Sequence, residues 1–93
     1  MGALRHAFDP ARDVANRARH GVSLALAEVL FAGPYTPLTD DRFKGGETRR
    51  IAFGHVADRL SVCVYVRREG ERRIFSLRKA NEREAARYAH ELE

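Results

Sequence analysis

Three strand-like segments joined by short connections constrain the fold of this 93-residue chain most strongly. Within the middle segment, residues 60–67, every second position is apolar, which is typical of a β-strand with one buried face: Leu60, Val62, Val64 and Val66. The flanking segments span residues 48–56 and 72–79, and only a few residues separate each from the middle one. Parallel neighbours would need a much longer crossover, so we expect an antiparallel meander.

The first third of the chain carries helix signals. Asp9 and Pro10 are a favoured N-cap and first helical residue, and Gly21 is a favoured end, so the sequence predicts a helix over 10–20. A second helix is expected to begin at the cap Ser23 and to end before residues 33–34, with an apolar stripe at helical spacing: Leu24, Leu26, Ala27, Leu30 and Phe31. Residues 4–8 are expected to form a short strand.

The remaining segments complete an α+β prediction. Residues 33–47 contain glycine, proline and polar residues without a period, and we expect an irregular crossing loop there. Asn81 and Glu84 resemble a capping box, which predicts a helix from Glu82 towards Leu92. The expected order is β-α-α-β-β-β-α in one domain over residues 1–93, with two N-terminal helices and one C-terminal helix beside an antiparallel sheet.

Charge and composition narrow the function classes. Seventeen Lys and Arg against thirteen Asp and Glu give a net charge of +4, which favours polyanionic partners such as RNA. The single cysteine, Cys63, resembles a buried strand residue and suits the reducing cytoplasm. No apolar run approaches the length of a membrane span. The histidines and Cys63 show no zinc-ligand spacing, so we expect neither a metal nor another cofactor.

Four cations and no acid occupy residues 72–79, and such charges face solvent or an anion. Strict alternation places Arg73 on the face opposite Arg78. Arg72 borders a turn and is expected to be surface, pairing with Glu69 or Glu71. Arg78 and Lys79, at the end of the strand, are the stronger candidates for phosphate contact.

The order and spacing of several motifs resemble the BrnT family over nearly the whole chain: residues 8–12, Asn16, residues 19–23, Arg49 before residues 51–54, residues 73–80, and Glu84 with Tyr88. This chain differs from the usual family residues at His6, Arg50 and Leu77. The resemblance implies a RelE-like fold and a bacterial type II toxin that cleaves RNA and inhibits translation. It also implies a cognate BrnA-type antitoxin with a ribbon-helix-helix domain. The toxin would contact operator DNA only indirectly, through this antitoxin.

RNA cleavage without a metal needs a base, an acid and cations around the phosphate. The candidates for the cationic role are Arg49, Arg73, Arg78 and Lys79. His20 is the first candidate for proton transfer, although a histidine at a helix C-terminus is also favoured by the helix dipole. Glu47 and Tyr88 are further candidates. The alternative for Glu47 is a loop carboxylate without a catalytic role, and the alternative for Tyr88 is a ring packed on the sheet. A nucleic-acid-binding module without catalysis, or a small interaction protein, is the alternative to the enzyme.

Overall fold

The computed structural model describes residues 4–40 and 48–88. Its order along the chain is β1 (Arg5–Ala7), α1 (Pro10–His20), the 3-10 turn η1 (Leu24–Leu26), α2 (Ala27–Ala32), β2 (Tyr35–Asp40), β3 (Arg49–Val56), β4 (Arg59–Arg68), β5 (Glu71–Lys79) and α3 (Glu82–Tyr88). The strands form one sheet in the order β1-β5-β4-β3-β2. The α+β class and the three expected helical regions are therefore confirmed.

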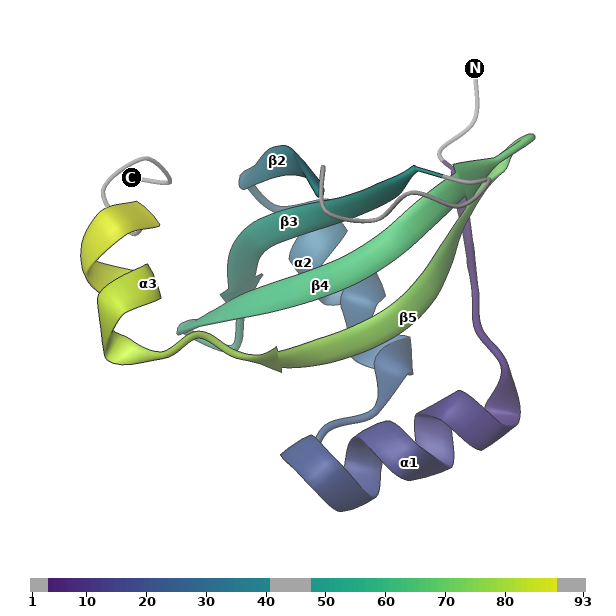
Figure 1. The fold of residues 1–93 in the computed structure, drawn as a ribbon, viewed down its shortest axis with the longest axis horizontal. Coiled ribbons are helices and arrows are strands. Elements are labelled where there is room, and N and C mark those ends of the chain that lie inside the picture. Colours follow the sequence, from purple (N-terminus) through teal and green to yellow (C-terminus); the bar gives the residue numbers. More distant parts are fainter. Residues whose placement is uncertain (1–3, 41–47, 89–93) are drawn as a thin grey trace.

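The expected meander is the centre of the sheet (Figure 1). β3, β4 and β5 pair antiparallel, while β1 pairs parallel with the beginning of β5. The β3–β4 turn holds Ala57 and Asp58 at positive φ, as a tight hairpin turn requires. The caps of α1 are also as predicted: Asp9 Oδ1 accepts from the Ala11 N–H at 2.8 Å, and Gly21 has φ of 77°.

The prediction of an irregular loop over 33–47 was wrong for residues 35–40, which form the edge strand β2. The strand pairs antiparallel with β3, from Tyr35 opposite Gly54 to Asp40 opposite Arg49. Pro37 lies in its middle and concealed the strand, because proline lacks an N–H and signals a loop. An edge strand hydrogen-bonds on one side only, so it tolerates this residue. The rest of the predicted loop, 41–47, lies outside the described residues.

The two faces of the sheet carry separate apolar clusters. η1 and α2 cover one face, where Leu24, Leu30, Ile74 and Leu77 are almost fully buried. α2 lies so close to β3 that a Cβ at Gly54 would be 2.8 Å from Leu30 Cγ. α3 packs on the other face at one end of the sheet, where the rings of Phe53 and Tyr88 stack with centroids 4.1 Å apart. Among the described residues, no helix covers the part of that second face between α1 and α3 (Figure 1).

Cys63 is fully buried beneath the helices, as predicted. Burial raises the pKa of its thiol to about 12. The thiol therefore stays protonated and unreactive, as expected of a structural cysteine.

A β-bulge in β5 overturns the predicted alternation of the 72–79 strand. Val64 pairs with Ser76 and Tyr65 pairs with Ile74, so Phe75 has no partner residue on β4. Ile74 and Leu77 consequently both face the core under α2. The extra residue shifts the alternation of the strand by one position, so Arg73 and Arg78 lie on the same face. The prediction that they point apart was therefore wrong.

The prediction for Arg72 was also wrong. Its guanidinium lies 4.0 Å from the ring centroid of Phe31, and its Nη2 donates to the Tyr35 hydroxyl at 2.9 Å. Its Nη1 is 3.1 Å from His6 Nε2, which must accept because arginine only donates. Burial, and next the charge of Arg72, lower the pKa of His6. Arg72 is therefore held among aromatic side chains that are distant in sequence, which no local pattern indicates.

Asn16 joins α1 to the sheet. β1 borders β5 only as far as Arg73, and beyond that point no strand within residues 4–40 and 48–88 lies beside the outer edge of β5. The buried Asn16 amide takes the place of one: Oδ1 accepts from the Leu77 N–H at 3.1 Å, and Nδ2 donates to the Leu77 carbonyl at 2.8 Å. Nδ2 also donates to the Val22 carbonyl at 2.9 Å. Every hydrogen-bonding group of this side chain is thus used.

We predict that Asn16→Ala lowers the free energy of unfolding by at least about 2 kcal/mol, since each buried polar group left without a partner costs roughly 1–3 kcal/mol. Urea unfolding followed by circular dichroism measures the change. Arg17→Ala, at an exposed position of the same helix, is the matched control and should change the value by less than about 0.5 kcal/mol. Equal stability of the two variants would contradict the assigned role of Asn16.

Candidate functional site

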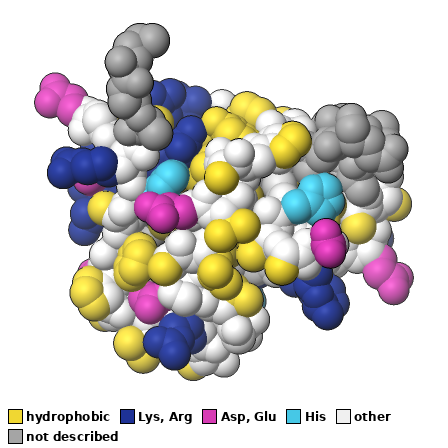
Figure 2. Space-filling model, turned by 180° about the vertical axis from the view of Figure 1, so that it is seen from behind, with side chains coloured by type: hydrophobic (Ala, Val, Ile, Leu, Met, Phe, Trp, Pro, Cys, Tyr) yellow, Lys and Arg dark blue, Asp and Glu magenta, His cyan; other side chains and the backbone are white. Residues whose placement is uncertain are grey.

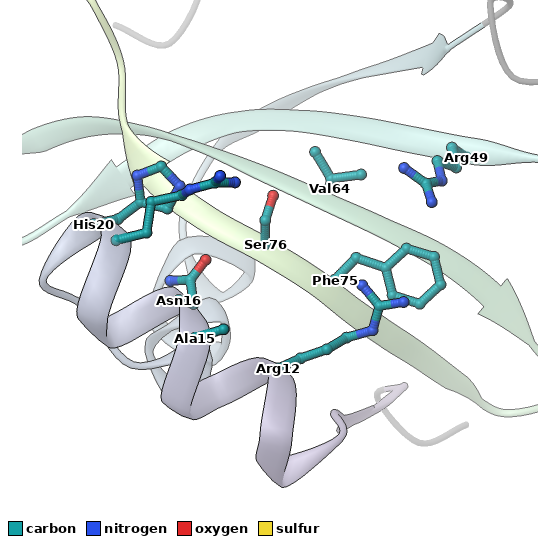
Figure 3. A pocket seen from close by; sticks show the side chains of 9 residues that line it. Arg12, Ala15, Asn16, His20, Arg49, Val64, Phe75 and Ser76 are labelled. Atoms are coloured by element: carbon teal, nitrogen blue, oxygen red, sulfur yellow. The ribbon is translucent and has the colours of Figure 1, made fainter.

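A cavity of about 290 Å³ lies between α1 and the sheet face opposite α2. Figure 3 shows His20 at one end, Arg12, Phe75 and Arg49 at the other, and Ser76 between them. The complete lining is Arg12, Ala15, Asn16, Arg19, His20, Arg49, Val64, Phe75 and Ser76. Helix, central strands and bulge thus contribute to one polar hollow.

The period of α1 explains its share of the lining. Its residues at positions 12, 15, 16, 19 and 20 recur at helical spacing and form one stripe along the helix. Asn16 fixes the rotation of that stripe through its bonds to Leu77. On another side of the helix, Asp13 Oδ1 accepts from the Ser23 hydroxyl at 3.0 Å and the Leu24 N–H at 2.7 Å. These two attachments orient the stripe towards the cavity.

The bulged residue Phe75 organises the basic end of the cavity. The guanidinium carbon of Arg12 lies 4.4 Å from the centroid of its ring, and that of Arg49 lies 5.2 Å from it. Attraction between a cation and an aromatic face is worth about 0.5–1 kcal/mol at an exposed site. One ring therefore holds two guanidiniums from distant parts of the chain near each other.

The α1 cations are not neutralised by neighbouring acids. Among the described residues, no ion pair involves Arg12, Arg19 or His20. Arg49 from β3 lines the same cavity, so three guanidiniums, an imidazole and the Ser76 hydroxyl share one lining. Guanidinium groups fit phosphate oxygens with two parallel hydrogen bonds, so this arrangement is suited to a phosphodiester.

Two further observations concern metal binding and membrane crossing within the described part of the chain. Residues 4–40 and 48–88 contain no group of three His, Cys, Asp or Glu side chains able to hold a metal ion. No helix within the same residues has the length and apolar character needed to cross a membrane.

The family model described as "Ribonuclease toxin, BrnT, of type II toxin-antitoxin system" matches residues 8–84. The chain belongs to the BrnT family. The matched region includes every residue that lines the cavity. No curated protein matches the chain. Membership of a type II toxin-antitoxin family implies an antitoxin partner for this BrnT chain.

Of the predicted site residues, the structure brings His20 and Arg49 into the cavity. Arg73 shares the sheet face with Arg49, but it lies outside the cavity lining and has a Glu71 carboxylate 3.8 Å away. Lys79 lines a second cavity on the other side of the sheet. Tyr88 is packed on Phe53, which was its alternative interpretation. Glu47 lies outside the described residues.

Of the nine residues that line this BrnT cavity, sequence reasoning missed seven, among them Arg12, Arg19, Phe75 and Ser76. The two arginines were detectable, because both lie at helical spacing from His20 within the predicted helix. The phenyl ring and the hydroxyl were not, because strict alternation assigns them to opposite faces of β5. Only the bulge brings both to one cavity.

Arg78, a predicted phosphate ligand, is held by α3. Its Nη1 and Nη2 donate to the two oxygens of Glu84 at 2.8 and 2.9 Å. Glu84 also accepts from the Asn81 N–H, and Asn81 Oδ1 accepts from the Glu84 N–H, which confirms the predicted capping box. The Arg78 hydrogen bond is the main cause of the lowered pKa of Glu84. Arg78 thus joins β5 to the start of α3.

We predict that this pair makes stability fall in acid. Because the folded pKa of Glu84 is lowered, its contribution is complete above the ordinary glutamate pKa and is lost as the pH falls through the folded value. Glu84→Gln should lose roughly 1 kcal/mol at pH 7 and show less loss between pH 7 and pH 3. Urea unfolding at both pH values measures this. Glu82→Gln, in the same helical turn, should keep the wild-type acid dependence; an unchanged dependence in Glu84→Gln would refute the assignment.

Proposed function

We propose that this chain is an endoribonuclease that cleaves RNA in the cavity between α1 and β5, and thereby inhibits translation. The observation that carries the proposal is that Arg12, Arg19, Arg49 and His20 line one cavity with Ser76, in a member of a ribonuclease toxin family. The layout of the sheet and helices is compatible with the RelE-like fold that we propose for it.

The proposed reaction uses the 2′-hydroxyl of RNA as the nucleophile. The hydroxyl loses its proton to a base as its oxygen attacks the adjacent phosphorus, and the bond from phosphorus to the 5′-oxygen breaks. That oxygen takes a proton from an acid, so a 2′,3′-cyclic phosphate and a 5′-hydroxyl result. Negative charge grows on the phosphate oxygens during this step. Arg12 and Arg49, held against Phe75, and Arg19 supply the compensating charge without a metal ion.

His20 is the proposed proton-transfer group. An ordinary imidazole can accept or donate a proton near neutral pH, and arginine cannot serve as a base because it stays protonated. His20 is exposed at the end of α1, at the opposite end of the cavity from Arg49 (Figure 3). The Ser76 hydroxyl between them is placed to donate a hydrogen bond to the phosphate.

The remaining predicted cations lie outside the RNA cavity. Arg73 shares the sheet face with Arg49, and we assign it to a phosphate that flanks the cleaved one. Lys79 lines the second cavity and has no part in RNA binding in this proposal. Arg78 instead fixes α3 through Glu84.

The proposed antitoxin is a BrnA-type protein with a ribbon-helix-helix domain, which binds the toxin and suppresses cleavage. Operator DNA would be contacted by that domain and not by the toxin itself. The positive charge of the RNA cavity gives an antitoxin an electrostatic reason to stay bound.

We predict that the purified chain cleaves single-stranded RNA in the presence of EDTA. Removing one charged donor from a preorganised site typically lowers the rate about 100-fold or more. Arg12→Ala and His20→Ala should each do so, while Arg17→Ala, which removes an exposed arginine outside the cavity lining on the same helix, should stay within about twofold of the wild type. Gel analysis of end-labelled RNA, with detection of the 2′,3′-cyclic phosphate, measures the rate.

Folded wild-type protein that binds RNA in a salt-dependent way without cleaving it would contradict the enzyme and favour a binding module. Equal rates of RNA cleavage for Arg12→Ala and the wild type would show that the reaction does not take place in this cavity. Cleavage abolished by EDTA would overturn the metal-free mechanism.

A further inference from the structure

A second cavity, of about 340 Å³, lies on the helix-covered side of the sheet, next to the β3–β4 turn. Its lining includes four aliphatic side chains, Val22, Leu26, Val56 and Leu77, and three cations, Arg59, Arg78 and Lys79. None of these seven residues lines the cavity assigned to RNA.

The aliphatic part of this cavity opens onto an apolar surface. Leu26 is 37% exposed although it belongs to η1, which packs on the core through Leu24. Val29 of α2, a turn further along, is 47% exposed. Figure 2 shows the molecule from this side, with hydrophobic side chains gathered over much of the surface. Exposed apolar side chains beside a cavity are candidates for contact with a protein partner.

The cations come from two adjacent strands. Lys79 pairs in register with Ser61, and Arg59 lies two residues before Ser61, so both point to the same side of the sheet. Both are exposed, and neither makes an ion pair with another described residue. Arg78, at the same end of the sheet, is by contrast bound to Glu84. An apolar hollow beside two uncompensated charges complements an apolar side chain flanked by carboxylates.

This chemistry favours a peptide over RNA. Bases are held on aromatic rings, and the lining of this cavity contains none besides the His20 imidazole, whereas the first cavity has Phe75 with its two guanidiniums. Aliphatic side chains at a cavity floor instead accept an aliphatic or aromatic anchor of a protein partner.

We propose that this second cavity is the docking site for an acidic segment of the antitoxin, with an apolar anchor on Leu26 and carboxylates at Arg59 and Lys79. The inference rests on the proposed function for the identity of the partner. His20 lines both cavities, so a segment seated here also covers the His20 end of the RNA cavity. Binding of the antitoxin segment would then itself inhibit RNA cleavage.

The test compares two pairs of charge variants, with the antitoxin produced from the gene beside this one as the probe. Leu26→Glu places a carboxylate on the aliphatic floor, and Val14→Glu makes the same change at a valine of α1 that is 67% exposed and outside the lining. Arg59→Glu reverses a charge at the cavity, and Arg67→Glu does so at the far end of the same strand. Calorimetry gives the dissociation constant, and RNA cleavage by the free variants is measured separately.

We expect Leu26→Glu and Arg59→Glu to weaken antitoxin binding at least tenfold and to cleave RNA at the wild-type rate, even with antitoxin present at concentrations that silence the wild type. The controls should stay within about twofold in both measurements. Wild-type affinity in Arg59→Glu, which changes an exposed residue and so preserves the fold, would overturn the proposal. Loss of RNA cleavage with unchanged antitoxin binding would assign the surface to RNA and overturn it too. A chain that never cleaves RNA would refute the proposed enzyme, while the four affinities would still decide the docking site.

Discussion

The pairing of the Asn16 amide with the backbone of Leu77 is the interaction on which the arrangement of this BrnT protein depends. β5 needs a partner at its outer edge beyond Arg73, and a single side chain from α1 supplies the missing donor and acceptor. The same contact fixes the rotation of α1, and with it the direction of Arg12, Arg19 and His20. The same two hydrogen bonds therefore complete the edge of the sheet and position the α1 residues that line the cavity.

The bulge at Phe75 adds the second half of the cavity. Without it, Phe75 and Ser76 would face opposite sides of β5; with it, both reach the polar hollow, and the ring gathers the guanidiniums of Arg12 and Arg49. The arginines of this chain thereby separate into two classes. Arg72 and Arg78 bind partners within the fold, whereas Arg12 and Arg19 keep their charge available for an anion.

Local patterns predicted what depends on local physics. Capping residues located α1, and apolar alternation and short turns located the meander. His20 and Arg49 line one cavity, and the roles assigned to them there stay predictions. Contacts between residues that are distant in sequence could not be predicted from local patterns. The 37 residues that separate Tyr35 from Arg72 hid the aromatic surroundings of that arginine, so it was mistaken for surface. β2 was hidden by Pro37, and nothing in the sequence marks the bulge that sets the faces of Arg73 and Arg78.

Occupation of the cavity between α1 and β5 by RNA can be measured by an NMR titration with a 2′-O-methyl RNA oligonucleotide, which lacks the attacking hydroxyl and stays intact. We expect saturable shifts of the Arg12 side-chain N–H, the Phe75 ring and the Ser76 amide, with the Leu26 methyl groups of the second cavity unchanged. Shifts confined to the second cavity, with Arg12, Phe75 and Ser76 unmoved at saturation, would contradict it.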